Sequence, residues 1–307
     1  MSIVVNNLSK SYKKVKALDE VSFEVKEGEL FGLIGPDGAG KTTLFRLLTT
    51  LLVADQGTAT VAGWDVVLDY KAIRNSVGYM PGRFSLYPDL TVEENLDFFA
   101  TVFGTSIKEN YYLVKDIYGQ IEPFKNRRAG KLSGGMKQKL ALSCALIHKP
   151  KVLFLDEPTT GIDPVSRKEL WEMLKRLKDK GITILVSTPY MDEAALCDRI
   201  ALIQEGKILD IDTPENIVNK HPMSIYNVSA NDTYQLLKDL REYPGYHSVF
   251  AFGEYVHYTD VDKAFNPGDL KNYLTGKNHQ QVEISPAKVS IEDVFMDLSP
   301  ERKTTEN

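Results

Sequence analysis

Cysteine is scarce in this chain of 307 residues, which contains only Cys144 and Cys197. Two cysteines cannot build a disulfide framework, so we expect reduced thiols in the core and a reducing compartment. The first residues lack a basic segment followed by an apolar stretch, and no apolar run approaches the ~18 residues that cross a bilayer. These absences predict a cytoplasmic protein, unless something else holds it at a membrane.

An excess of positive charge is also missing. The chain has 37 Lys and Arg against 42 Asp and Glu, a net charge of −5. Binding to a phosphate backbone normally shows as a basic footprint, so we expect no nucleic-acid partner. The hydrophobic fraction of 43% and the charged fraction of 26% are ordinary for a globular protein. The length allows a main domain and a smaller one.

The order of apolar segments predicts an α/β fold for the main domain. The first thirty residues indicate short strands of a β subdomain, which we expect to be antiparallel. A buried strand at residues 30–34, a glycine-rich turn and a helix at residues 41–52 follow. Residues 86–149 favour an inserted helical subdomain. The α/β pattern then returns, with strands at residues 152–155 and 182–186 around a helix at residues 164–180.

Beyond about residue 220 the sequence pattern changes to short strand-like segments around helix-like ones. We expect the main domain to occupy residues 1–220, a small α+β domain residues 221–300, and a disordered tail residues 301–307. Aromatic residues of the small domain are expected to pack its core: Tyr243, Tyr246, Phe250, Phe252, Tyr255 and Tyr258. Nothing among them selects a ligand, although a regulatory or dimer-contact role is an alternative.

A phosphate-binding pattern lies between the strand at residues 30–34 and the following helix. The segment reads Gly35-Pro36-Asp37-Gly38-Ala39-Gly40-Lys41-Thr42-Thr43 and fits G-x-x-x-x-G-K-[ST]. The glycines let backbone N–H groups surround phosphates, and the helix N-terminus adds partial positive charge. Lys41 can reach the β- and γ-phosphates, and the Thr42 hydroxyl can bind Mg²⁺. A glycine-rich turn without a ligand is the weaker alternative in this context.

Two carboxylates end the apolar strand at residues 152–155. We expect Asp156 to belong to the Mg²⁺ shell and Glu157 to polarise an attacking water, so that Glu157 and Lys41 are the candidate catalytic residues. Paired acids at a strand end can instead be solvated caps. The phosphate-binding pattern upstream makes that alternative the weaker one.

Three further stretches resemble the ATP-binding subunits of ABC transporters. Leu132-Ser133-Gly134-Gly135-Met136-Lys137-Gln138 resembles the signature motif of that family. Pro158-Thr159-Thr160-Gly161-Ile162-Asp163-Pro164 resembles its D-loop. Tyr12, in what we expect to be a polar loop, sits where the family has an adenine-stacking aromatic, although a merely exposed tyrosine is the alternative. The resemblance covers roughly residues 1–220.

The resemblance implies a P-loop NTPase fold with a RecA-like core and an ATPase that uses ATP and Mg²⁺ to drive transport. It also implies a head-to-tail dimer of two ATPase subunits, on the cytoplasmic face of the membrane, below a separate transmembrane permease. In such a dimer the signature residues of one subunit reach the ATP on the other. The residues concerned here are Ser133, Gly134, Gly135 and Gln138, with Asp163 in the D-loop.

A subgroup is also suggested. Asp37 stands where most members have Asn, and the segment Val289-Ser290-Ile291-Glu292-Asp293-Val294-Phe295 resembles the tails of the same branch. Both features resemble the daunorubicin-type drug exporters. They imply export, while the transported molecule is set by the permease and leaves no trace in this sequence.

Two positions depart from the family pattern. Gly82 replaces the Q-loop glutamine, and Pro189 replaces the switch histidine, where we expect Thr188 to cap a helix that starts at the proline. A lost donor in such a site commonly costs ~10²–10³ in rate. We therefore expect this chain's own site to bind ATP and hydrolyse it slowly, while its intact signature motif serves a better-equipped partner. A heterodimer is favoured over a homodimer that tolerates both changes.

Two other functions remain as alternatives. One is a nucleotide-binding regulatory subunit with little turnover. The other is a soluble ABC ATPase that acts on ribosomes or DNA. Proteins of that second class usually carry tandem ATPase domains, long coiled-coil insertions or basic extensions, and this sequence has none of them.

Overall fold

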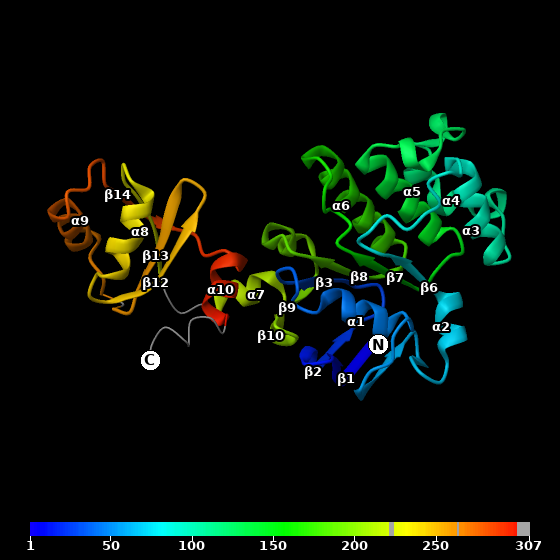
Figure 1. Ribbon diagram of the computed structural model, residues 1–307, viewed down its shortest axis with the longest axis horizontal. Coiled ribbons are helices and arrows are strands. Elements are labelled where there is room, and N and C mark those ends of the chain that lie inside the picture. The colour runs from blue at the N-terminus through cyan, green and yellow to red at the C-terminus, as the bar shows by residue number, and fades with distance from the viewer. Residues whose placement is uncertain (221–223, 263, 300–307) are drawn as a thin grey trace. The chain divides into compact units, whose positions relative to one another are not determined.

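The computed structural model describes residues 1–220, 224–262 and 264–299 (Figure 1). Contacts within the chain define two compact units, Met1–Pro214 and Glu215–Asn307, and each is considered by itself. The predicted tail, residues 301–307, lies outside the described residues. Among the residues that are described, no helix is long and apolar enough to cross a bilayer.

A six-stranded sheet forms the centre of the first unit. Its strands, in spatial order, are β10 (Lys207–Asp212), β9 (Arg199–Gln204), β3 (Leu30–Ile34), β8 (Thr183–Thr188), β7 (Val152–Asp156) and β6 (Val77–Met80). All neighbours are parallel except β10, which runs antiparallel to β9. Every residue of β3, β7 and β8 is buried. Strands covered on both faces need continuous apolar runs, which is why these three could be recognised in the sequence.

A second, antiparallel sheet packs against the core of this unit. It contains β2 (Val15–Val25), β1 (Ile3–Tyr12), β4 (Gln56–Val61) and β5 (Trp64–Asp65), in that order. Alternate residues such as Ile3, Val5 and Val61 join one hydrophobic cluster with Phe45 of α1 (Lys41–Leu48). The predicted antiparallel β subdomain is thereby confirmed.

Helices cover both faces of the six-stranded sheet (Figure 1). The helical elements after α1 are α2 (Tyr70–Ser76), α3 (Val92–Val102), α4 (Ile107–Tyr118), α5 (Gly134–Leu146) and α6 (Pro164–Asp179), with 3₁₀ turns at Glu122–Phe124, Ala129–Lys131 and Met191–Leu196. Helix α1 ends at Leu48, short of the predicted residue 52. Helices α3, α4 and α5 follow β6 and precede β7 in the chain. They pack together and form the expected helical insertion.

The second unit has the βαββαβ order of a ferredoxin-like fold. Its elements are β11 (Ile225–Ser229), α8 (Thr233–Arg241), β12 (Tyr246–Phe252), β13 (Tyr255–Asp260), α9 (Pro267–Gly276) and β14 (Glu283–Ala287), with α7 (Pro214–Asn219) before them and α10 (Ile291–Leu298) after them. The antiparallel sheet has the order β12-β13-β11-β14. A small α+β domain was the expectation, and this unit has that architecture.

The aromatic residues of the second unit do not all pack its core. Tyr258 is fully buried among Leu236, Leu240 and Leu270. Tyr246 and Tyr255, by contrast, are each 44% exposed. The prediction of a shared aromatic core was therefore wrong for these two. Tyr255 alternates along β13 with the buried Val256, so it points to the opposite face of the sheet. Phe250 and Phe252 are half-buried and lie outside the hydrophobic cluster, whereas Tyr243 packs against it.

Candidate active site

The glycine-rich segment forms a tight loop between β3 and α1. Gly40 precedes the helix with φ 104°, and no side chain caps the helix N-terminus. The first N–H groups of a helix have no partner inside it, so they are available to an anion. A Cβ atom at Gly35 would lie 2.0 Å from the Ile203 carbonyl oxygen, and one at Gly40 would lie 2.4 Å from that of Ala17. Only glycine allows the neighbouring backbones to approach so closely.

Lys41 is 3% exposed and extends along the inside of this loop. Its Nζ donates to the carbonyl oxygens of Gly35 and Pro36, at 2.8 and 2.9 Å. The same Nζ lies 3.2 Å from Oε1 of Glu157. The two predicted catalytic residues, far apart in the sequence, are thus in contact.

Asp156 ends β7 and faces the start of α1. The Thr42 hydroxyl donates to its Oδ2 at 2.8 Å, and the Ser187 hydroxyl donates to its Oδ1 at 2.7 Å. The two residues predicted to hold Mg²⁺ therefore lie side by side. Ser187 was not among the predicted site residues. A polar residue at the buried end of β8, next to β7 in a parallel sheet, was the available signal.

Glu157 has a left-handed backbone, with φ 52°. Its N–H donates to both the carbonyl oxygen and the hydroxyl of Ser187, at 3.1 and 3.0 Å. A non-glycine residue in this region is strained and persists only where its surroundings hold it. The parallel neighbour β8 thus fixes the residue that follows β7.

The signature segment begins α5. Ser133 caps the helix, because its hydroxyl accepts from the Met136 N–H at 3.4 Å. Ser133 and Gly134 are exposed, and Gln138 is half-buried. A Cβ atom at Gly135 would lie 2.7 Å from the Ser166 hydroxyl, so the small residue lets α5 approach the start of α6.

Asp163 caps that neighbouring helix. Its carboxylate accepts from the N–H groups of Val165 and Ser166 and from the Ser166 hydroxyl. The hydrogen bonds from Ser166 hold the pKa of Asp163 below its ordinary value. The signature and D-loop segments of one chain are therefore neighbours on the surface of the first unit.

The two departures from the family pattern lie beside the carboxylates. A Cβ atom at Gly82 would be 3.0 Å from the Asp156 carbonyl oxygen. Pro189 directly follows β8, whose end supports Glu157. The prediction that a helix starts at Pro189 was wrong. The 3₁₀ turn begins at Met191, and the Thr188 hydroxyl accepts from the Tyr190 N–H at 3.1 Å.

Tyr12 is the last residue of β1, not part of a loop as expected, and it is 43% exposed. Its strand partner is Val15, across the turn to β2. The residues of β2 that pack on the glycine-rich segment are Ala17, through its carbonyl oxygen, and Leu18, through its side chain, and both meet Gly40. Ala17 was not predicted, because a small apolar residue in a strand has no distinctive pattern.

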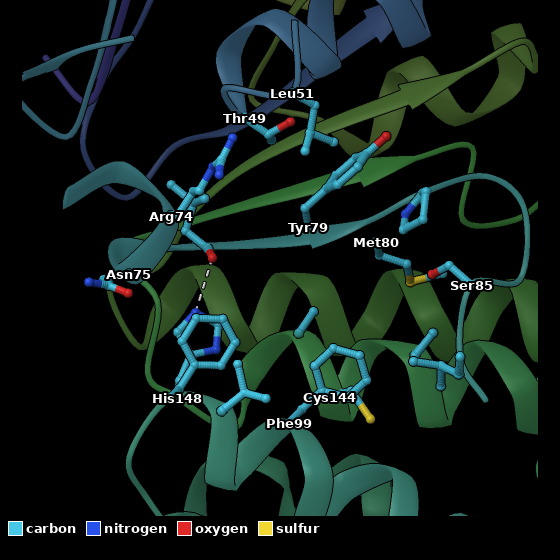
Figure 2. A pocket seen from close by; sticks show the side chains of 17 residues that line it. Thr49, Leu51, Arg74, Asn75, Tyr79, Met80, Ser85, Phe99, Cys144 and His148 are labelled. Carbon is cyan, nitrogen blue, oxygen red and sulfur yellow. Dashed lines mark hydrogen bonds between the residues drawn. The ribbon is translucent and has the colours of Figure 1, made fainter. Parts of the chain in front are cut away.

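An apolar cavity of about 450 Å³ lies between the core sheet and the helical insertion. Figure 2 shows Tyr79 and Met80 of β6 above Phe99, Cys144 and His148 from the helical side. His148 stacks on Phe103 at 3.8 Å and bonds through Nε2 to the Val77 carbonyl oxygen at 3.0 Å. Burial lowers the pKa of His148. Burial, together with the charge of Asp156, raises the pKa of Tyr79 to about 12.

Residues 18–160 match the model of the family described as "ABC transporter". The chain is 35% identical over 297 residues to Nod factor export ATP-binding protein I of Burkholderia lata, covering 95% of both proteins. It is 39% identical over 245 residues to the doxorubicin resistance ATP-binding protein DrrA of Mycobacterium tuberculosis, covering 78% of this chain and 73% of DrrA.

A longer relative matches the chain over part of its own length. The probable multidrug ABC transporter ATP-binding protein YbhF of Escherichia coli K12 is 37% identical over 312 residues. The match covers 99% of this chain and 53% of YbhF, so the chain spans about half of that protein.

Solved structures share the fold of the first unit. A structure titled as the ATP-binding subunit of an ABC transporter is similar with a TM-score of 0.66 at 29% identity, over 72% of this chain and 93% of that one. A dimeric, post-hydrolysis state of the cassette MJ0796, bound to ADP and Pi, is similar with a TM-score of 0.63 at 26% identity, over 69% and 98%. The P-loop fold class predicted for the main domain is confirmed.

Proposed function

Because this chain belongs to the ATP-binding subunits of the ABC transporter family, we propose that it binds ATP and couples its hydrolysis to export through a separate permease. The observation that carries the proposal is the contact of the glycine-rich loop with the two carboxylates: Lys41 lies 3.2 Å from Glu157, and Thr42 is hydrogen-bonded to Asp156 at 2.8 Å. This arrangement joins the groups that phosphoryl transfer needs in one place.

Each residue has a defined task in the proposed reaction. The N–H groups at the start of α1 and the Lys41 ammonium bind the β- and γ-phosphates. Thr42 and Asp156 would supply the oxygen ligands that Mg²⁺ prefers, and an ion held there would neutralise charge on the phosphates. Glu157 accepts a proton from the attacking water. Tyr12 stacks on the adenine ring from the end of β1.

The same site lacks two side chains that would assist hydrolysis. Gly82 offers no oxygen to the ion or the water, and Pro189 offers no donor to the γ-phosphate. We propose that this chain's own site turns over slowly. Its exposed Ser133, with Gly134, Gly135 and Gln138, completes the site of a partner across a head-to-tail dimer, in which Asp163 also faces the partner. The partner in this proposal is an unlike ATPase subunit.

The apolar cavity of Figure 2 is where we propose that the permease contacts the chain, on the cytoplasmic face of the membrane. Exposed apolar side chains beside it support this placement: Leu51 and Val102 line the cavity and are 55% and 61% exposed. The name of the relative Nod factor export ATP-binding protein I supports export rather than import.

The test is to measure ATP hydrolysis by the chain alone and by the chain mixed with an unlike ATPase subunit from the same operon. The chain alone should bind ATP with Mg²⁺ and turn over slowly. The mixture should be faster. Glu157→Gln in this chain should change the mixture less than about twofold, whereas Ser133→Arg should lower it ~100-fold, because the signature serves the partner's site.

Ser285→Arg, at an exposed position of the second unit, is the matched control for the added charge and should have no effect. Fast turnover by the chain alone, abolished by Glu157→Gln, would contradict the slow-site proposal. A chain without nucleotide affinity, even with Mg²⁺ and the partner present, would refute the function as a whole. A mixture that binds ATP but hydrolyses it no faster than the chain alone would favour the alternative of a regulatory subunit with little turnover. Gly82 and Pro189 are the two residues that favour this alternative.

A further inference from the structure

A buried carboxylate that has no role in the proposed mechanism lies beside the segments around Glu157. Glu193, in the 3₁₀ turn at Met191–Leu196, is 2% exposed. Its Oε2 accepts from the Thr159 hydroxyl at 3.0 Å and from the Thr188 hydroxyl. Its Oε1 accepts from Nε of Arg167 at 2.5 Å. These four residues, Thr159, Arg167, Thr188 and Glu193, are called the Glu193 cluster.

The Glu193 cluster binds both segments that hold Glu157. Thr159 is two residues after Glu157 in the chain. Thr188 directly follows Ser187, which accepts the hydrogen bonds from the Glu157 N–H. One carboxylate oxygen of Glu193 therefore joins the segment that carries Glu157 to the strand end that fixes it.

The conformation of Glu157 gives this connection a physical purpose. Its φ of 52° is strained for a non-glycine residue and persists only under external restraint. The two hydrogen bonds to Ser187 restrain the Glu157 N–H group. The hydrogen bond from Thr159 to Glu193 restrains the segment that follows Glu157 in the chain. Without it, the loop after Glu157 could relax and move the carboxylate away from Lys41.

Arg167 completes the cluster by balancing the charge of Glu193. A buried carboxylate is stable only when paired and hydrogen-bonded. The Arg167 guanidinium also lies over the Tyr190 ring at 4.1 Å and bonds to Asp192 at 3.4 Å. Since Arg167 is in the first turn of α6, it links the helix capped by Asp163 to the segment that follows Pro189.

We infer that Glu193 is a positioning residue for Glu157: the Glu193 cluster holds the Glu157 backbone in its left-handed conformation by fixing Thr159 and Thr188 to one carboxylate. The inference rests on the proposed function, in which Glu157 accepts the proton of the attacking water. The restraint acts through the main chain on both sides of Glu157 and does not involve the side chain at position 189.

A second buried ion pair in the same unit provides a matched control. Glu29, 6% exposed, pairs with Arg199 at 3.3 Å, and the Arg199 side chain is 27% exposed, as is that of Arg167. Glu29 directly precedes β3, at the opposite end of the strand from the glycine-rich loop. Glu29→Ala therefore removes a comparable buried carboxylate without touching the segments that hold Glu157.

The experiment compares the full chain with Glu193→Ala, Glu193→Gln, Thr159→Val and Glu29→Ala. Amide hydrogen exchange is measured at Glu157 and Thr160, with Leu153 of β7 as the internal reference. In Glu193→Ala we expect exchange at Glu157 and Thr160 to be ~10-fold faster relative to Leu153, because local opening is sensitive to local restraints. Thr159→Val, which removes one hydroxyl and keeps the shape, should show the same change at smaller size.

The slow ATP hydrolysis by the chain alone supplies the second readout, because hydrolysis in the mixture takes place mainly at the partner's site. Glu193→Ala should lower kcat about 10-fold with the KM for ATP unchanged within about twofold, since misplacement of a reacting group mainly affects the chemical step. Glu193→Gln keeps an oxygen for one hydrogen bond and should recover most of kcat. Added to Glu157→Gln, Glu193→Ala should cause no further loss.

Equal exchange at Glu157 and Thr160 in Glu193→Ala, Thr159→Val and Glu29→Ala would overturn the inference. So would a loss of kcat in Glu29→Ala as large as that in Glu193→Ala. The proposed function fails differently: in that case the chain binds no nucleotide, even with Mg²⁺ and the partner present. The exchange measurement needs no turnover and decides the role of Glu193 in either case.

Discussion

Single residues decide what the site can do with a bound triphosphate. Lys41, Thr42, Asp156 and Glu157 are held by hydrogen bonds or ion pairs to one another, so the groups proposed to bind phosphate and water are already assembled. Pro189 follows the last buried residue of β8, next to the strand end that fixes Glu157. A side chain at position 189 that donates a hydrogen bond is the smallest change that would give the site a donor to the γ-phosphate.

Pro189→His should therefore raise turnover by this chain's own site. We expect an increase of ~10-fold, less than the ~10²–10³ that a preorganised donor commonly supplies, because Gly82 remains. The measurement is ATP hydrolysis at saturating ATP and Mg²⁺.

Pro189→Leu is the matched control, since it removes the proline ring without adding a donor. Equal rates in Pro189→His and Pro189→Leu would show that position 189 does not limit turnover. A rise that persists after Glu157→Gln would place the hydrolysis elsewhere.

Short helices in this protein depend on their first residues. Helix α3 starts with a capping box, in which the Thr91 hydroxyl accepts from the Glu94 N–H at 3.2 Å and the Glu94 carboxylate accepts from the Thr91 N–H at 2.7 Å. Helix α4 repeats the arrangement with Ser106 and Glu109. Because Phe99 and Val102 of α3 line the apolar cavity, the start of this helix positions one wall of it.

Thr91→Ala should destabilise the first unit. Loss of an N-cap hydroxyl costs about 1 kcal/mol, which corresponds to a decrease in Tm of about 2–4 °C for a unit of this size. Thermal unfolding followed by circular dichroism measures the change.

Thr101→Ala makes the same substitution at an exposed position near the end of the same helix and should be neutral or slightly stabilising. If both variants melted at the wild-type temperature, the capping box would not contribute measurably to the stability of α3.

At the scale of the whole molecule, the chain consists of two units with separate cores. The first core includes Phe45, Phe154 and Leu185, and the second includes Leu236, Tyr258 and Leu270. Every residue assigned to the proposed ATP site lies within Met1–Pro214. Nucleotide binding should therefore be a property of the first unit.

A chain that ends at Asn219 should bind ATP with a Kd within about threefold of that of the full chain, because no contact in the proposed site is removed. Calorimetry with ATP and Mg²⁺ measures it. Lys41→Ala in the shortened chain should abolish the heat of binding, which verifies that the same site is measured. A tenfold weaker Kd in a shortened chain that retains its secondary structure would mean that the second unit contributes to the site.

Several features of this protein are determined by its sequence alone. The glycine-rich loop and the apolar strands β3, β7 and β8 depend on residues close together in the chain, so spacing and residue type predict them. The candidate pairs Lys41 and Thr42, and Asp156 and Glu157, are recognisable for the same reason. Each belongs to a short pattern at the end of a strand or the start of a helix.

Other features are decided only by the tertiary structure. Ser187 beside Asp156, Ala17 against Gly40 and the Glu193 cluster bring together residues from different strands and helices, and no local pattern marks them. The position of Tyr12 at a strand end and the delayed 3₁₀ turn after Pro189 follow from pairing and burial, not from propensity. Sheet order sets these neighbours, because parallel strands adjacent in space are joined by long crossovers in the chain.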